Sequence, residues 1–297
     1  MREPAIIRML ADGRRLHLHD GPIDLIVEAN GSAQAIQAAY EAAAQRFPAI
    51  LDELCAELTL LRSAWRDDSE PPQGPIARRM AQAVAPYARH NFITPMAAVA
   101  GAVAEEILYA ITNAAQLDRA YVNNGGDIAL HLSCGERYKI GMVERPDRLS
   151  LFGSFEISHS MPIRGVATSG WRGRSFSMGI ADAVTVLAET AAMADAAATI
   201  IANAVDLPGH RLIVRVPANE IAPDSDLGFR LVTRAVGNLS ASEIATALDA
   251  GARVAEGLLA TGLIVAAALN LHHETRVVSD LALQKTMDIS SRSLLHA

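Results

Sequence analysis

The chain has 297 residues, of which 51% are hydrophobic and 20% charged, a composition typical of a globular protein with a sizeable core and not of a disordered one. Its formal net charge of −7 argues against the basic surface that binding to a phosphate backbone needs, so we expect no nucleic-acid partner. We expect a single domain over residues 1–297, or two intimately packed lobes, with a surface loop or linker in the polar, proline-rich stretch 66–75.

The N-terminal segment predicts neither export nor membrane attachment. Residues 1–15 carry charges throughout and lack an apolar core of signal-peptide length. The most apolar later run, residues 257–268, is too short and too interrupted by Gly and Thr to span a bilayer. We therefore expect a cytoplasmic protein with no membrane partner.

The first elements in chain order are two short strands around a turn at Asp12-Gly13 and a third strand over residues 23–28. Ser32 is placed to cap a long helix that we expect to reach about Leu61, because apolar side chains recur near the 3.6-residue helical spacing. After the loop, helices are expected over residues 76–87 and 96–113.

The early turns of the helix expected over residues 96–113 carry small side chains: Ala97, Ala98, Ala100, Gly101 and Ala104. Small residues permit the close approach either of another helix or of a ligand, and packing against a helix is the favoured interpretation. Glu105 and Glu106 follow on the same helix. We expect both to face solvent, with the alternative that one of them points into a site.

A strong turn signal at residues 123–126 separates strands expected over residues 120–122 and 127–132. The simplest interpretation is a hairpin that needs no ligand. The alternative is that Gly125 and Gly126 present backbone N–H groups to an anion, with Asp127 directly after them. Further β-type segments predict an antiparallel meander over residues 137–142, 149–157 and 163–168.

Two hydroxyls and a glycine, Thr168-Ser169-Gly170, close the last of these strands. Such a group can hold phosphate oxygens or form an ordinary turn, and the residues alone favour the turn. Arg172 and Arg174 lie just beyond it.

The centre of the chain predicts a β-branched strand at residues 184–186, a tight turn, and an alanine-rich helix ending near residue 205. Inside the helix, Asp195 and Thr199 stand at i and i+4, so both oxygens project from one face. Their neighbours are apolar, and an unpaired carboxylate in such surroundings costs several kcal/mol.

A carboxylate and a hydroxyl beside small residues suit Mg²⁺, which prefers oxygen ligands and completes its shell with phosphate and water. The alternative is that Thr199 bonds back to the Asp195 carbonyl while Asp195 caps another segment or faces solvent. The spacing alone favours this alternative.

The remaining elements are a strand over residues 211–216, a helix over 240–259 and a strand over 264–271. His272 and His273 follow, and on a continued strand they would point to opposite faces and would not share a metal. The sequence contains no HExxH, GxSxG, phosphate-loop or Rossmann signature.

Three segments, in this order, resemble the ApbE superfamily, whose known members are FAD:protein FMN transferases. Residues 123–127 resemble its GGD turn, residues 167–170 match its ATSG segment, and residues 184–199 match its VTV…ADAxAT segment. The resemblance covers roughly residues 97–205. It implies an α+β, ApbE-like fold, related to the T-fold, in which mixed sheets and helices enclose a central cleft.

The resemblance also implies the site. Asp195, as the catalytic residue, and Thr199 would hold Mg²⁺ against the pyrophosphate of FAD or another nucleotide. The nucleotide would be lined by two turns, Gly125, Gly126, Asp127 and Thr168, Ser169, Gly170. The implied partners are a flavin or other small-molecule ligand and an acceptor protein, and the Ala- and Gly-rich helices would also support a homodimer.

One segment departs from the family. The transferases carry a His and a DPxTG-like turn between ATSG and VTV, whereas residues 171–183 contain neither His nor Pro. Three functions therefore remain open. The first is a Mg²⁺-dependent flavin or nucleotide transferase or pyrophosphatase. The second is a non-transferase enzyme of cofactor or small-molecule metabolism that recognises an anion through Arg172, Arg174 and His159. The third is a non-catalytic nucleotide-binding protein.

Overall fold

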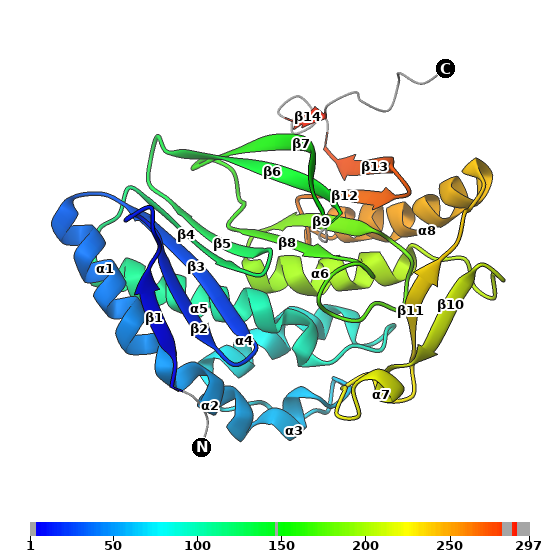
Figure 1. Ribbon diagram of the computed structural model, residues 1–297, viewed down its shortest axis with the longest axis horizontal. Coiled ribbons are helices and arrows are strands. Elements are labelled where there is room, and N and C mark those ends of the chain that lie inside the picture. Colours follow the sequence, from blue (N-terminus) through cyan, green and yellow to red (C-terminus); the bar gives the residue numbers. More distant parts are fainter. Residues whose placement is uncertain (1–3, 146–147, 281–286, 290–297) are drawn as a thin grey trace. The chain divides into compact units, whose positions relative to one another are not determined.

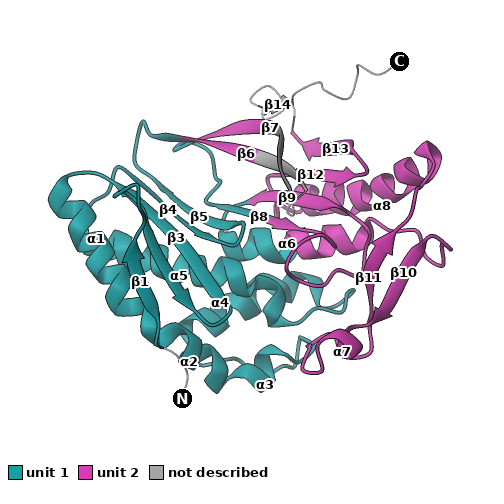
Figure 2. Cartoon of the chain, in the orientation of Figure 1, with its two compact units in different colours: residues 1–137, 158–167, 188–196 teal, residues 138–157, 168–187, 197–297 magenta. Residues whose placement is uncertain are grey.

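The computed structural model of the chain describes residues 4–145, 148–280 and 287–289. Contacts divide the chain into two compact units, shown in Figure 2. Unit 1 contains residues 1–137, 158–167 and 188–196, and unit 2 contains residues 138–157, 168–187 and 197–297. Each unit is therefore built from separate stretches of sequence. The mixed α+β class is confirmed, and a single domain over residues 1–297 stays a prediction.

Unit 1 contains an antiparallel sheet with the strand order β1-β2-β3-β4-β5-β8 (Figure 1). Burial alternates along β2 and β3, and Leu18, Leu25 and Val27 are fully buried on the covered face. The predicted hairpins around residues 12–13 and 123–126 are both present. The strands are β1 (Ile6–Met9), β2 (Leu16–Asp20), β3 (Ile23–Asn30), β4 (Arg119–Asn124), β5 (Asp127–Leu132) and β8 (Gly165–Ser169), of which β8 leaves unit 1 after Ala167.

The first helix of unit 1 begins where the sequence predicts and ends earlier. Ser32 caps α1 (Ala33–Arg46), because its Oγ accepts a hydrogen bond from the Ala35 N–H at 3.1 Å. The expected continuous helix to Leu61 is wrong. Pro48, which lacks an N–H, lies in a 3₁₀ turn, and short helices follow it. These are η1 (Phe47–Ala49), α2 (Ile50–Ala56) and α3 (Leu58–Leu61).

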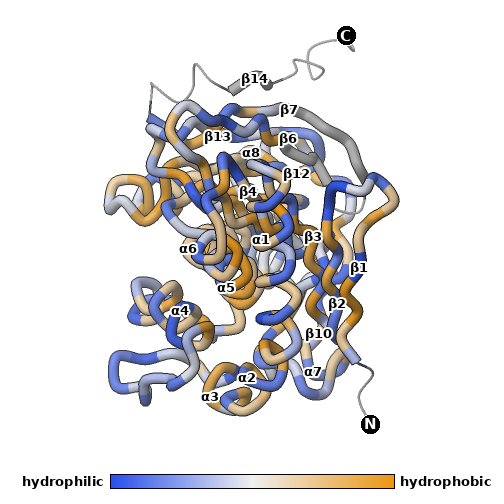
Figure 3. Tube along the Cα trace, turned by 90° about the vertical axis from the view of Figure 1, so that its left-hand side faces the viewer, coloured by the Kyte–Doolittle hydropathy of each residue, from blue (hydrophilic) through white to orange (hydrophobic). Residues whose placement is uncertain are grey.

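The remaining helices of unit 1 centre on α5 (Val99–Ala114). Helix α5 packs on β4 and β5, while α1 and α4 (Pro75–Val84) pack against α5. Its trace is predominantly hydrophobic in Figure 3. The 3₁₀ turns η2 (Ala85–Tyr87) and η3 (Pro95–Ala98) complete this part. The predicted loop near residues 66–75 is a largely exposed loop inside unit 1 and not a linker between the units.

One helical stretch of the described chain, Pro95–Ala114, is long and apolar enough to cross a membrane by length and composition alone. Half of its apolar window is buried inside the protein. Because α5 packs on two strands and two helices of unit 1, this apolar character matches that of a core helix.

Unit 2 contains three small antiparallel groups of strands. The strand order β9-β12-β13 is formed by β9 (Ala183–Ala188), β12 (Ala266–Leu271) and β13 (Glu274–Ser279). Helix α8 (Ala241–Ala260) packs on β12 and β13 and begins with a capping box between Ser240 and Glu243. Helices α6 (Ala191–Ala204), shared between the units, and α7 (Ala218–Ile221) complete the helical part.

The other two groups are β10 (Ile213–Pro217) with β11 (Leu231–Val236), and the order β14-β7-β6, formed by β14 (Met287–Ile289), β7 (Arg148–Ser158) and β6 (Arg137–Arg145). The predicted meander over residues 137–168 is therefore wrong in part, because β6 and β7 belong to a different sheet from β8.

His272 and His273 form the turn between β12 and β13, since Leu271 pairs with Glu274. Both histidines have positive φ values, 48° and 71°. Two-residue hairpin turns with two positive φ angles match the right-handed twist of the flanking strands. The predicted end of the strand at Leu271 is confirmed, whereas the turn itself was not predicted, because it lacks the Asn and Gly that normally mark such a connection.

Candidate functional site

Helix α6 follows β9 through a tight turn, as the sequence predicts. Thr190 directly precedes the helix, and its Oγ1 accepts a hydrogen bond from the Met193 N–H at 3.3 Å. Asp195 and Thr199 lie on this one helix at i and i+4, so they share a face. Thr199 is half-buried, and its hydroxyl makes no hydrogen bond to any residue that the structure describes.

Asp195 contacts the first turn of α5, within unit 1. Its Oδ2 accepts a hydrogen bond from the Gly101 N–H at 3.0 Å. The first N–H groups of a helix have no partner inside that helix, so Asp195 acts as a cap for α5. The alternative interpretation is thus confirmed in part: Asp195 caps another segment, at Gly101, 94 positions earlier in the chain, whereas Thr199 makes no bond back to the Asp195 carbonyl among the described residues.

The small residues at the start of α5 serve close packing. A Cβ atom on Gly101 would lie 2.3 Å from the carbonyl oxygen of Ala191, at the start of α6. Gly165 of β8 is equally constrained, because its Cβ would lie 2.0 Å from the Thr190 carbonyl oxygen. Two glycines therefore let a helix and a strand approach the start of α6, which supports the packing interpretation of the small residues.

The electrostatic surroundings of Asp195 are unfavourable to its charge. Burial and, second, the negative charge of Asp127 raise the pKa of Asp195 well above its usual range, while the N–H groups of Gly101 and Ala100 act in the opposite direction. Glu105 adds a smaller effect of the same sign as Asp127. Carboxylates with strongly perturbed pKa values concentrate at functional sites, so Asp195 remains the leading candidate.

The predicted turn beside Asp127 is present, but one of its backbone donors is used in a hydrogen bond within the turn. Gly125 and Gly126 have φ values of 66° and 120°, which glycine adopts readily. The Gly126 N–H donates to Asn123 Oδ1 at 2.8 Å, so this donor is already in use. Asn124 Nδ2 donates to the Ala100 carbonyl at 3.2 Å, which ties the hairpin to the start of α5.

Glu105 and Glu106 were expected to face solvent, and the structure places both inside unit 1. Glu105 Oε1 accepts a hydrogen bond from the Ala192 N–H at 2.7 Å, and its Oε2 lies 3.0 Å from Arg79 Nε. Burial raises the pKa of Glu105. Glu106 is also buried, yet hydrogen bonds from Arg46 and Arg79 outweigh that burial and lower its pKa. Two adjacent carboxylates in an apolar helix were the signal that could have revealed this network.

The predicted residues Thr168, Ser169 and Gly170 belong to unit 2. The hydroxyl groups of Thr168 and Thr185 lie 2.9 Å apart and form a hydrogen bond. A Cβ on Gly170 would lie 2.6 Å from the Asp182 carbonyl oxygen, so a larger residue does not fit. The structure therefore groups Asp195, Asp127 and the glycine turn in unit 1, and the Thr168–Gly170 segment with its own partners in unit 2.

The residues proposed to recognise an anion are mostly engaged elsewhere. Arg172 pairs with the buried Asp182 and lies 4.3 Å from the centroid of the Trp171 ring. His159, in unit 1, has its Nδ1 2.7 Å from the Leu132 carbonyl oxygen. Arg174 is exposed. Arg172 and Arg174 belong to unit 2 and His159 to unit 1.

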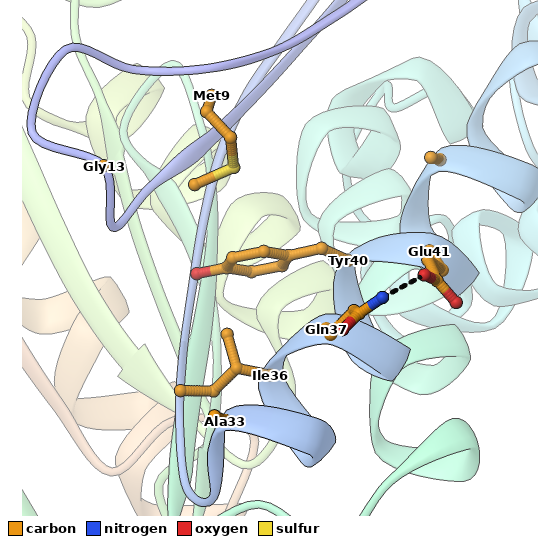
Figure 4. Close-up of a pocket in the computed structure, with 8 residues that line it drawn as sticks. Met9, Gly13, Ala33, Ile36, Gln37, Tyr40 and Glu41 are labelled. Atoms are coloured by element: carbon orange, nitrogen blue, oxygen red, sulfur yellow. Dashed lines mark hydrogen bonds between the residues drawn. The ribbon is translucent and has the colours of Figure 1, made fainter.

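Two hollows are found in unit 1, away from the predicted residues. A groove of about 530 Å³ runs between the β1 hairpin and α1, where Gln37 donates to Glu41 at 2.9 Å (Figure 4). It is lined by Met9, Gly13, Ala33, Ile36, Gln37, Tyr40, Glu41 and Ala44. A second hollow of about 780 Å³ lies near Ser32 and His131. Among the described residues, no three His, Cys, Asp or Glu side chains are grouped to hold a metal ion by themselves.

Several curated proteins with similar sequences share one name, UPF0280 protein. A UPF0280 protein of Methanothrix thermoacetophila is 37% identical over 150 residues, which cover 50% of this chain and 59% of that protein. A UPF0280 protein of Methanopyrus kandleri is 40% identical over 130 residues, which cover 43% of this chain and 48% of that protein. The chain thus spans about half the length of the curated relatives it matches.

Solved structures give a distant likeness. The ApbE protein of Thermotoga maritima matches with a TM-score of 0.45 and 11% identity over 95% of this chain and 98% of that one. The flavin transferase ApbE of Vibrio cholerae matches with a TM-score of 0.43 and 11% identity over 95% of this chain and 100% of that one.

The family assignment rests on a match to the chain's own sequence. The family model described as AbpE bacteria matches residues 7–277, which include the GGD-like turn, the ATSG segment and the ADAxAT helix. Because this match covers most of the chain, the protein belongs to the AbpE bacteria family, in agreement with its ApbE-like motifs.

Proposed function

We propose that the protein is a divalent-metal-dependent enzyme that acts on the pyrophosphate of a flavin nucleotide, with Asp195 and Thr199 as its metal ligands. The flavin is supported by the family match together with the ApbE-like motifs at residues 123–127, 167–170 and 184–199. The observation that carries the proposal is the environment of Asp195, a carboxylate whose neighbours Asp127 and Glu105 are also acidic.

The donor set fits a hard cation. A positive ion beside Asp195 would offset the burial and the like charges that raise the pKa of this carboxyl. Thr199 offers a hydroxyl oxygen on the same face of α6. Two protein ligands are few, and this matches Mg²⁺, which is usually held by one or two protein groups together with phosphate oxygens and water.

Bound at these oxygens, Mg²⁺ would neutralise charge that develops on the phosphoryl oxygens during attack on the pyrophosphate. The chain's own residues would orient the nucleotide. The proposed lining residues beside Asp195 are Gly125, Gly126 and Asp127, all in unit 1. Thr168, Ser169 and Gly170 of unit 2 stay residues that the family resemblance implies. Because the Gly126 N–H is already bonded to Asn123, the remaining backbone of that turn would make the contact.

A second candidate function, binding of the nucleotide without group transfer, is favoured by the segment that replaces the His-containing region. Asn203 Oδ1 accepts hydrogen bonds from the Met178 N–H at 2.9 Å and from the Ser177 hydroxyl at 3.2 Å. Gly179 is pressed against the Ala202 carbonyl. Residues 177–179 are thus packed onto the end of α6, where they serve structure.

Thermal melting with FAD, FMN, ADP and ATP, each with and without Mg²⁺, tests the proposal. A ligand that binds only the folded state stabilises it by about 2.7 kcal/mol at a concentration of 100 Kd. We expect FAD with Mg²⁺ to raise the Tm of the wild type and not that of Asp195→Ala. Equal shifts in both proteins would refute the metal assignment, and release of FMN or AMP from FAD would separate catalysis from binding.

A further inference from the structure

Helices α5 and α6 cap each other. Asp195 of α6 accepts the Gly101 N–H at the start of α5, at 3.0 Å. Glu105 of α5 accepts the Ala192 N–H at the start of α6, at 2.7 Å. Each carboxylate therefore satisfies an N–H that its partner helix leaves unbonded and lies at the positive end of that helix dipole.

Asp195 follows the first turn of α6 on the same helix. Glu105 accepts a hydrogen bond from Ala192, which lies three residues before Asp195. Asp195 is therefore on the helical turn that directly follows this contact. The backbone of the first turn is also fixed from two sides by Gly101 and Gly165, whose missing side chains allow contact with residues 190–191. A shift of this turn would move Asp195 directly.

Glu105 is itself held in place. Arg79 of α4 binds Glu105 through Nε at 3.0 Å and Glu106 through Nη1 at 3.0 Å. Arg46 of α1 binds Glu106 at 2.7 Å and Glu53 at 2.6 Å. The carboxylate that caps α6 is thus supported by ion pairs reaching three other helices, and both glutamates of α5 are largely buried.

We propose that Glu105 is a positioning residue for the metal ligand Asp195, acting through the first turn of α6. The inference rests on the proposed function, in which Asp195 holds a divalent cation. Groups that do not touch the metal but hold its ligands in place matter for binding: their removal typically weakens metal affinity about 10–100-fold. Glu106 belongs to the same ion-pair network and makes no hydrogen bond to α6 among the described residues, so it provides a matched control.

Three variants separate positioning from general stabilisation. Glu105→Met keeps the side-chain volume and removes the acceptor for the Ala192 N–H. Glu105→Gln keeps an acceptor and removes the charge. Glu106→Met removes a buried carboxylate of the same network without touching α6. Each variant is compared with the wild type and with Asp195→Ala, well below its own unfolding temperature.

The first measurement is Mn²⁺ affinity by calorimetry. We expect Glu105→Met to weaken binding about 10–100-fold, while Glu105→Gln and Glu106→Met stay close to the wild type. An unchanged affinity in Glu105→Met would overturn the inference. A loss in Glu105→Gln as large as that in Glu105→Met would also overturn it, because charge and not the hydrogen bond would then be responsible.

The second measurement needs no metal. In protein labelled with ¹⁵N-glycine, the amide exchange rate of Gly101 reports its hydrogen bond to Asp195. We expect faster exchange in Glu105→Met and not in Glu106→Met. If the wild type binds Mn²⁺ no better than Asp195→Ala, the proposed function fails. The exchange rate alone then decides whether Glu105 positions Asp195. Faster exchange would then support the positioning role, and unchanged exchange would overturn it.

Discussion

Two carboxylates that are buried or half-buried, one in each unit, have different charged neighbours. Asp182 in unit 2 is 2% exposed and is bound by the Arg172 guanidinium and by the His272 N–H at 2.7 Å. Asp195 in unit 1 has backbone N–H donors, while the charged groups that act on it, Asp127 and Glu105, are acidic.

The difference separates a structural carboxylate from a candidate ligand. Asp182 has a cation supplied by the chain, and it joins the segment after Gly170 to the turn between β12 and β13. The ionised form of Asp195 would need a bound cation to stabilise it. Burial of a carboxylate is therefore less informative than the sign of the charges placed around it.

The largest expected effect comes from breaking the structural pair. Asp182→Ala leaves the largely buried Arg172 without its partner and frees the His272 N–H, so we expect a loss of about 3–5 kcal/mol in the free energy of unfolding, measured by urea titration. Arg174→Ala, at an exposed site in the same segment, should change stability by less than about 0.5 kcal/mol. Equal effects of the two substitutions would contradict the structural role of Asp182.

The next effect tests the contact that holds the start of α5 against α6. Gly101→Ala places a Cβ 2.3 Å from the Ala191 carbonyl, so the helices must move apart, at a cost of about 1–3 kcal/mol. Gly257→Ala in α8 is the matched control, because a Cβ there meets nothing within 4 Å and alanine is the better helix former. Thermal melting should show opposite signs for the two variants, and a neutral Gly101→Ala would show that the crossing is loose.

The smallest effect is a dependence on pH. The pKa of Asp195 is raised above its ordinary value of 3.8 in the folded protein, so the folded state keeps this proton to higher pH than the unfolded chain. The stabilising contribution is present below pH 3.8 and is lost as pH rises through the folded pKa. Asp195→Asn lacks this loss, so without metal its Tm relative to the wild type should increase from pH 4 to pH 7.

Added Mg²⁺ sharpens the same experiment. At pH 7 it should raise the Tm of the wild type and leave that of Asp195→Asn unchanged, because only the carboxylate attracts the cation. A difference between the two proteins that stays flat with pH would show that Asp195 is accommodated like Asp182.

Local signals in the sequence predicted local structure well. Ser32 caps α1, the glycine turn before Asp127 forms a hairpin, and Asp195 and Thr199 share a helix, all because these features depend on neighbouring residues. The helix was wrongly expected to continue through Pro48, although proline cannot continue a helix without losing a hydrogen bond and so could have predicted the break.

Distant contacts were not readable in the same way. The partner of Asp195 is Gly101, and the partner of Glu105 is Ala192, neither of which any spacing rule connects. The turn at His272 was missed because its two positive φ angles are imposed by pairing of β12 with β13 and not by glycine. Long-range packing therefore carries the information that periodicity lacks.

The mutual capping of α5 and α6 has a consequence for how the chain acquires its structure. The two hydrogen bonds join residues 94 and 87 positions apart, and the last stretch of unit 1 to be synthesised is residues 188–196. Until that stretch leaves the ribosome, Gly101 at the start of α5 lacks the cap from Asp195, and Glu105 lacks its hydrogen bond from Ala192 of α6. Completion of unit 1 therefore requires the closure of a large loop, and a late step in which the α5–α6 contact forms is the expected kinetic signature.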